Sequence, residues 1–353
     1  MSKTNFDIST LVRKNVLRMK PYSSARDEFK GEAEVFLDAN ENPYPSPFNR
    51  YPDPLQWPLK EKIAGIKNVL PGQIFLGNGS DEAIDLLIRA FCEPHRDSIL
   101  IAEPTYGMYA VCAEVNAVNI QRMLLTTGFD IDMNAYHAAV DATTKIIFLC
   151  SPNNPTANLL DTNKVVEIIS SFEGLVVIDE AYIDFAASDG FAGTLEQYPN
   201  LVILQTFSKA WGLAGLRLGM CLAGEDIIGI LNKIKYPYNV NIRTQELALE
   251  ALSNHAAKEA WVNEILGERE KLADGLKGLS IVEGVFPSDA NFLLVRFQDA
   301  PGVYKKLMAQ NIIVRDRSRV ALCFNCIRIT IGTPEENKKL IKALKNYEKS
   351  ALY

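Results

Sequence analysis

The sequence predicts an α/β protein in which a largely parallel sheet is covered by helices on both faces. Four short runs rich in Val, Ile and Leu predict buried strands at 98–102, 145–150, 175–180 and 201–207. Stretches with helical character, such as 82–91 and 162–172, separate these runs. Near-continuous apolar strands that alternate with helices are typical of parallel sheets buried on both faces.

The pattern changes after about Tyr238, where the apolar strand runs end. A long helical region at 244–276 is followed by shorter strands mixed with helices, and Pro334 suits the first turn of a closing helix. Since 353 residues exceed the length of a typical single domain, we expect more than one. The expected parts are an N-terminal arm (1–45) that contributes to the small domain and the site, a large domain (46–240) and a small α+β domain (241–353).

Composition narrows the class of protein. A hydrophobic share of 48% is ordinary for a soluble globular protein with a full core. The net charge of -6 argues against nucleic acid as the main partner, because phosphates need a basic excess. The N-terminal charges do not fit a signal peptide, and no uncharged run approaches the roughly 20 residues of a membrane span. We therefore expect a cytoplasmic protein that binds neither membranes nor nucleic acid.

The cysteines predict no disulfide framework and no metal site. The pair Cys323 and Cys326 forms a single C-x-x-C motif, whereas a zinc site needs a second pair or two suitably spaced histidines. His95, His137 and His255 lie singly and far apart. Redox chemistry at the motif is also disfavoured, because Cys326 leads directly into a strand-like run.

The first segment with chemical potential is LGNGSDE at 76–82, between an apolar run and a helix. Glycines allow a tight turn, and Ser80 or Asp81 can cap the helix that follows. Such a loop presents N–H groups and the positive helix end to an anion. It is not a dinucleotide-binding motif, because Glu82 occupies the last glycine position. A simple capped turn remains an alternative.

The second and third segments each follow a buried strand. Asp179 ends one strand, where side chains point into the crevice that binds ligands in parallel sheets. Lys209 follows another, and a partly desolvated lysine can lose its proton and form a Schiff base with a carbonyl group. Arg217, eight positions after Lys209, adds a positive charge that can bind a phosphate group. The alternatives are a loop carboxylate for Asp179 and a solvated strand-end lysine for Lys209.

Together these parts match the needs of pyridoxal phosphate (PLP). A phosphate loop, an acid that keeps the pyridine nitrogen protonated and a lysine that forms a Schiff base would let the cofactor ring accept electrons from a substrate carbanion. The three isolated histidines offer no competing Ser/His/Asp arrangement.

At this point the chain resembles the fold-type I PLP enzymes and, more closely, the histidinol-phosphate aminotransferases. The resemblance covers nearly the whole chain and rests on the order of nine motifs. These are KPYSSAR (20–26), LDANENPYP (37–45), RYPDP (50–54), LGNGSDE (76–82), PTYGMY (104–109), SPNNPT (151–156), DEAYIDF (179–185), SKAWGLAGLRLG (208–219) and CIRITIG (326–332). It implies a mostly parallel seven-stranded sheet between helices and a smaller α+β domain. Ala157 and Trp211 depart from the usual pattern but keep small and aromatic character.

The resemblance also implies roles for single residues. The catalytic residues would be Lys209, which bears PLP, Asp179, which pairs with the pyridine nitrogen, and Tyr182. Asn154 and Tyr182 would bind the ring hydroxyl oxygen, and Tyr106 would stack on the ring. The remaining cofactor residues would be Ser80, Asp81, Glu82, Ser208, Arg217 and, from across a homodimer interface, Tyr51. The substrate residues would be Tyr22, Asn40, Arg315 and Arg328. Arg317 and Arg319 are expected to be solvated loop charges.

The activity that the resemblance implies is amino transfer between L-histidinol phosphate and 2-oxoglutarate, which gives imidazole acetol phosphate and glutamate in histidine biosynthesis. The alternatives are the same chemistry on aromatic amino acids and PLP-dependent decarboxylation of a phosphorylated amino acid. A PLP-sensing regulatory module is disfavoured, because the arm before residue 45 is too short and not basic enough for a DNA-binding domain.

Overall fold

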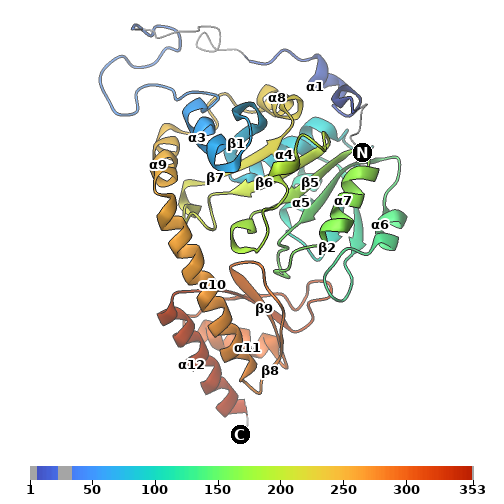
Figure 1. The fold of residues 1–353 in the computed structure, drawn as a ribbon, viewed down its shortest axis with the longest axis vertical. Helices are drawn as coiled ribbons and strands as arrows, with labels where there is room; N and C mark the ends of the chain where they lie inside the picture. The colour runs from blue at the N-terminus through green and yellow to red at the C-terminus, as the bar shows by residue number, and fades with distance from the viewer. Residues whose placement is uncertain (1–5, 23–33, 352–353) are drawn as a thin grey trace.

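The computed structural model describes residues 6–22 and 34–351, so Ser23 to Arg26 of the KPYSSAR motif lie outside the described residues. Figure 1 shows two parts, a larger one built on strands β1 to β7 and a smaller one that contains β8, β9, α11 and α12. Helix α10 (His255–Lys277) runs from the first part into the second. The α/β fold with a smaller α+β part is confirmed.

The large sheet has seven strands in the order β1-β7-β6-β5-β4-β2-β3. Their bounds are β1 Ile74–Asn78, β2 Ser98–Glu103, β3 Asn119–Leu124, β4 Thr144–Cys150, β5 Leu175–Asp179, β6 Leu201–Thr206 and β7 Leu218–Ala223. All neighbours are parallel except β7, which is antiparallel to β1 and β6. The carboxyl ends of β2, β4, β5 and β6 therefore meet at one edge, where such sheets bind ligands.

Apolar layers cover both faces of this sheet. Alternating residues of β5 enter different clusters, since Val176 and Ile178 pack on one face and Val177 on the other. One face carries α4 Ser80–Phe91, α5 Met108–Val115 and α8 Glu225–Ile234; the other carries α3 Trp57–Lys67, α6 Met133–Ala139, α7 Thr162–Ser171 and α9 Ile242–Ser253. This burial on both faces explains why the strand sequences are continuously apolar.

The small sheet has four antiparallel strands in the order β10-β11-β9-β8. Its strands are β8 Val282–Val285, β9 Phe292–Phe297, β10 Arg315–Asp316 and β11 Cys326–Thr330. Helices α10, α11 Ala300–Ala309 and α12 Pro334–Ala351 bury its apolar core. A separate cluster joins the two parts, because Tyr182 and Phe185 of the large part pack with Val262 and Phe292.

Several local details differ from the expectation. The single helix expected at 244–276 is two helices, α9 and α10, which meet at Asn254 with a backbone φ of -111° and ψ of 52°. The N-terminal elements η1 Ile8–Thr10 and α1 Lys14–Arg18 lie against the large part, where Val12 and Val16 are buried. The other short 3-10 turns are η2 Pro71–Gln73, η3 Ile183–Phe185, η4 Ala192–Thr194 and η5 Ala214–Leu216.

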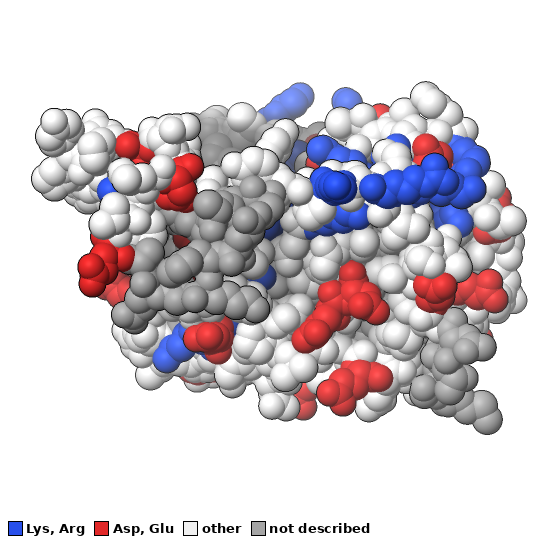
Figure 2. All heavy atoms as spheres, turned by 90° about the horizontal axis from the view of Figure 1, so that it is seen from above, with Lys and Arg blue, Asp and Glu red and all other residues white. Residues whose placement is uncertain are grey.

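The surface and the cysteines complete the description. Seen from above, Lys and Arg side chains gather in one area while Asp and Glu gather in others (Figure 2), so the two signs of charge are separated on this face. All six cysteines are free and buried. Among the described residues, no helix is both long and apolar enough to cross a bilayer, and no cluster of potential metal ligands is found.

Candidate active site

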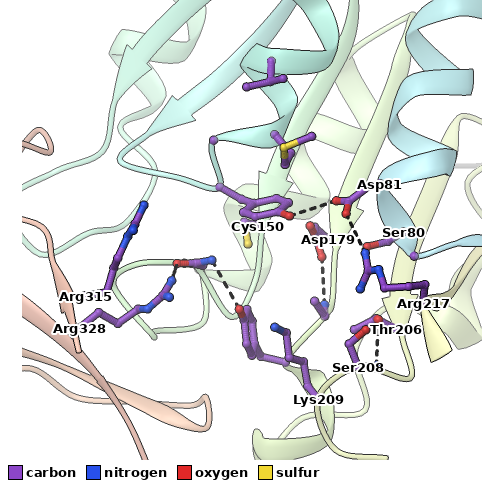
Figure 3. Close-up of a pocket in the computed structure, with 18 of the residues that line it drawn as sticks. Ser80, Asp81, Cys150, Asp179, Thr206, Ser208, Lys209, Arg217, Arg315 and Arg328 are labelled. Atoms are coloured by element: carbon purple, nitrogen blue, oxygen red, sulfur yellow. Dashed lines mark hydrogen bonds and ion pairs between the residues drawn. The ribbon is translucent and has the colours of Figure 1, made fainter. Parts of the chain in front are cut away.

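A cavity of about 660 Å³ opens at the carboxyl edge of the parallel strands. Its floor comes from the ends of β4, β5 and β6, at Cys150, Asp179 and Thr206. Figure 3 shows Arg217 on one side, Arg315 and Arg328 on the opposite side, and Asp179 and Lys209 between them. The predicted site residues that line it are Ser80, Asp81, Tyr106, Asn154, Asp179, Tyr182, Ser208, Lys209, Arg217, Arg315 and Arg328.

Asp179 is a buried carboxylate held by two donors. The Tyr109 hydroxyl donates to Asp179 Oδ2 at 2.7 Å, and the Ala181 N–H donates to Oδ1 at 3.0 Å. Burial raises the pKa of Asp179, while the hydrogen bonds from Tyr109 and Ala181 oppose that rise by stabilising the ionised form. The structure thus holds a carboxylate in a low-dielectric place with its charge partly compensated.

Lys209 lies in a fixed loop after β6. The Gly212 N–H donates to the Lys209 carbonyl at 3.1 Å, and the Leu213 N–H donates to Phe207 at 3.0 Å. The Lys209 amino group faces the cavity 5.6 Å from the centre of the Tyr182 ring. Desolvation lowers the pKa of Lys209, and Arg328 lowers it further, which favours the neutral amine that acts as a nucleophile.

The amino end of α4 forms a candidate anion site. Gly79 is the N-cap residue, with φ of 75°, and no side chain caps the helix, so the expected capping by Ser80 or Asp81 is wrong. The first N–H groups of α4 remain available to a ligand, and the helix dipole favours an anion there. Arg217 adds a cation 3.3 Å from Asp81, whose other oxygen accepts from the Tyr106 hydroxyl at 3.0 Å.

Close backbone packing shapes this anion site. A Cβ atom at Gly219 would lie 2.1 Å from the backbone nitrogen of Ser80, so only glycine lets β7 approach the start of α4 so closely. The loop is also fixed by the Gly79 N–H, which donates to the Arg217 carbonyl at 2.7 Å. Gly79 and Gly219 therefore allow the start of α4 and the start of β7 to lie close together, which brings Arg217 to the amino end of the helix.

The opposite wall carries arginines from the small sheet. Arg315 on β10 is the register partner of Arg328 on β11. Arg328 donates to Asn154 Oδ1, and Asn154 Nδ2 donates to the Tyr182 hydroxyl at 3.4 Å. This chain of contacts connects the two parts of the molecule. The sequence interpretation of Arg317 as a solvated charge is wrong, because Arg317 is half-buried and lines the cavity, whereas Arg319 is exposed and lies outside it.

Four predicted residues lie away from the cavity in this single chain. Glu82 accepts from the Asn78 N–H at 2.6 Å and from Asn239 at 3.1 Å, so it fixes the loop before α4. Tyr51 is 49% exposed and its ring stacks on Tyr238 at 4.3 Å. Tyr22 and Asn40 are also exposed. The structure does not bring these four residues to the site.

Sequence reasoning missed other residues at the site. Tyr109 belongs to the quoted PTYGMY motif, yet the sequence does not tell that its hydroxyl reaches Asp179. Thr206 accepts from the Ser208 N–H at 3.1 Å and lines the cavity with Cys150. Cys150 ends β4 and Thr206 ends β6, so the rule that placed Asp179 at the site could have found these two residues.

Comparison with known proteins agrees with this geometry. Residues 32–344 match the family "Aminotransferase class I and II". A histidinol-phosphate aminotransferase of Parabacteroides distasonis is 57% identical over 340 residues, which cover 96% of this chain and 99% of that protein. One from Cytophaga hutchinsonii is 55% identical over 346 residues, covering 97% and 99%.

Solved structures share the fold. The histidinol-phosphate aminotransferase of Clostridium acetobutylicum superposes with a TM-score of 0.79 at 25% identity, covering 86% of this chain and 92% of that one. An L-threonine-O-3-phosphate decarboxylase of Porphyromonas gingivalis gives 0.73 at 25% identity, covering 85% and 91%. The family match over most of the chain and the identity above one half place the protein among the class I and II aminotransferases, in the histidinol-phosphate aminotransferase family.

Proposed function

We propose that this protein transfers an amino group from L-histidinol phosphate to 2-oxoglutarate, giving imidazole acetol phosphate and glutamate in histidine biosynthesis, with PLP held by Lys209. The observation that carries the proposal is the position of Lys209 and Asp179 between Arg217 on one side and Arg315 and Arg328 on the other (Figure 3). The side with Arg217 and the amino end of α4 suits the cofactor phosphate, and the side with Arg315 and Arg328 suits an anionic substrate.

The residues of the cavity fit PLP. The carboxylate of Asp179 suits the protonated pyridine nitrogen, and the Tyr109 hydroxyl at 2.7 Å helps to keep that carboxylate ionised. The amino end of α4, Ser208 and Arg217 offer donors to a phosphate. When bound, PLP supplies an electron-accepting ring that stabilises negative charge on the substrate carbon.

The protein groups around the reacting atoms have distinct tasks. Lys209 Nζ, whose pKa desolvation lowers, would carry a proton between the cofactor and the substrate carbon that bears the amino group. Asn154 and Tyr182, which are hydrogen-bonded to each other, orient the ring oxygen of the cofactor. Tyr106 offers its aromatic face to the ring.

Arg315 and Arg328 are the proposed substrate residues. Guanidinium groups bind both carboxylates and phosphates through paired hydrogen bonds, so the same wall can receive glutamate and a phosphate monoester in turn. Asn154 already accepts from Arg328, which fixes its direction toward the cavity. We include Tyr22 and Asn40 as substrate residues that the N-terminal arm would bring to the site, and Glu82 as a support of the cofactor loop.

We further propose a homodimer in which Tyr51 reaches the cofactor phosphate of the neighbouring subunit. Large apolar side chains in and next to the arm support this assembly, because Val35, Leu37, Tyr44 and Phe48 are each more than half exposed in the single chain. The domain division at 45 and 240 and a cytoplasmic location stay proposals. The six free, buried cysteines agree with a reducing compartment.

The test is the absorption spectrum of the purified protein with PLP, before and after L-histidinol phosphate is added. Conversion of the bound cofactor to its amino form, and its recovery with 2-oxoglutarate, is the expected result. A spectrum that responds only to aromatic amino acids would keep the class and reject the substrate. Release of CO₂ without amino transfer would favour the decarboxylase alternative.

A further inference from the structure

Arg317 follows β10 and turns back toward β11. Its backbone N–H donates to the Cys326 carbonyl at 2.8 Å, and its carbonyl accepts from the Val320 N–H at 2.8 Å. These two bonds fix the backbone between the two strands that carry Arg315 and Arg328. The half-buried side chain of Arg317 therefore lines the cavity beside theirs.

The guanidinium of Arg317 is poorly satisfied without a ligand. Its Nε is buried and has no hydrogen-bond partner in the part of the chain that the structure describes. Burial, with a smaller contribution from the neighbouring cations Arg328 and Arg315, lowers the pKa of Arg317 to about 10. A buried donor without a partner costs free energy, so this position is one that a bound acceptor would stabilise.

The carboxylates of the site do not neutralise this cation group. Asp81 pairs with Arg217, and Asp179 is held by Tyr109 and Ala181 on the cavity floor. Asp316 accepts from the Ser318 N–H at 2.8 Å and from the Ser318 hydroxyl at 2.6 Å, so its carboxylate is hydrogen-bonded within its own loop. Among the described residues, no ion pair joins a carboxylate to Arg315, Arg317 or Arg328.

We infer that Arg317 is a third guanidinium for the phosphate of the substrate and distinguishes a phosphate monoester from a carboxylate. This inference rests on the proposed function and extends it. A phosphate dianion has three free oxygens and about two charges, whereas a carboxylate has two oxygens and one charge. A third guanidinium therefore stabilises the phosphate more than it stabilises a carboxylate of glutamate in the same place.

The test compares R317Q with R319Q in the PLP-loaded protein. Arg319 is the matched control, because it lies two positions away and is exposed outside the cavity. Each amino-donor half-reaction is followed by the spectrum of the bound cofactor, with L-histidinol phosphate, L-histidinol or glutamate. R317Q should lower kcat/KM for L-histidinol phosphate by about tenfold or more, chiefly through the dissociation constant, as expected for lost hydrogen bonds to a charged group.

The other donors separate recognition of phosphate from a structural role. R317Q should change kcat/KM for glutamate and L-histidinol by less than about threefold, and R319Q should change none of the three by more than about twofold. R317K should recover part of the loss, because it restores the charge without the planar fork. Equal losses with L-histidinol and L-histidinol phosphate, or no loss with either, would overturn the inference.

A second measurement does not require the proposed substrate L-histidinol phosphate. Inorganic phosphate should inhibit the glutamate half-reaction competitively, and R317Q should weaken that inhibition about tenfold while R319Q leaves it unchanged. If the wild-type protein does not react with L-histidinol phosphate, the proposed function fails, and this measurement alone decides the role of Arg317. Equal phosphate inhibition of wild type and R317Q would refute it.

Discussion

Replacing Tyr109 with Phe removes one hydroxyl group from the floor of the site and keeps the packing of the ring. The ring is fully buried, stacks on Phe148 at 4.7 Å and meets the edge of Tyr106 at 5.6 Å. None of these contacts needs the hydroxyl. The substitution therefore removes the 2.7 Å hydrogen bond from Tyr109 to Asp179, together with the contact between the hydroxyl and the Cys150 thiol.

The size of the effect follows from the charge of the acceptor. A hydrogen bond to an ionised group contributes about 1.5–3 kcal/mol, so its loss favours protonated Asp179 by roughly 10- to 150-fold. Burial already raises the pKa of Asp179, and the Tyr109 bond opposes that rise. The pKa of Asp179 in Y109F should therefore be higher than in the wild type, and less of the acid is ionised at low pH.

The assay is the pH dependence of kcat/KM for the L-histidinol phosphate half-reaction. At acidic pH, below both pKa values of Asp179, Y109F should be about tenfold slower or more, and the two proteins should converge as the pH rises. The matched control is Y347F, which removes a tyrosine hydroxyl that donates to Asp299 at 3.3 Å, far from the cavity. An acidic limb at the same pH in wild type and Y109F would refute the reasoning.

Three further predictions follow from single contacts. K209A should lose the visible absorption of lysine-bound PLP and on the order of a thousandfold of turnover, while circular dichroism shows an unchanged fold. G219A should weaken PLP binding and lower the free energy of unfolding by about 1–3 kcal/mol in a denaturant titration, because its Cβ would lie 2.1 Å from Ser80 N; a wild-type value would contradict the close approach. Burial raises the pKa of Glu180 from 4.5 to about 7, so the folded state binds its proton more tightly than the unfolded state, and stability is lost as the pH rises from about 4.5 to about 7. E180Q should remove that slope from unfolding titrations, and a slope as steep as in the wild type would reject the assignment.

Burial decided how well the elements could be predicted from the sequence. Strands β2, β4, β5 and β6 lie in the middle of the sheet, so both faces are apolar and their predicted bounds agree within one residue. Strand β3 lies at the edge, and its sequence NIQRML places exposed polar residues among apolar ones. It lacks the continuous pattern that predicts a buried strand. The antiparallel direction of β7 depends on pairing with β1 and β6, which sequence alone does not determine.

The site residues also differ in how well the sequence predicts them. Asp179 and Lys209 were predictable because Asp179 ends one buried strand and Lys209 follows another, and the topology brings such positions to one edge. Tyr109 and Arg317 were not, because their roles depend on where a side chain ends rather than on where its backbone lies. Arg317 stands in a polar loop, where most arginines are solvated, and only its packing beside Arg328 reveals a buried donor.

The division of charge between the two parts of the molecule would let one cavity serve the two proposed substrates. In the proposed function, the large part supplies Asp179, Lys209 and the anion site of α4, which would act on the cofactor and on the reacting carbon. The small part supplies the arginines, which would face the end of the substrate that differs between glutamate and a phosphate monoester. The bond from Arg328 to Asn154 links these two functions, because Asn154 also contacts Tyr182. An anion that draws the arginines together would therefore also fix the groups that orient the cofactor ring, so recognition of the substrate's distant end and alignment of its reacting end depend on the same contact.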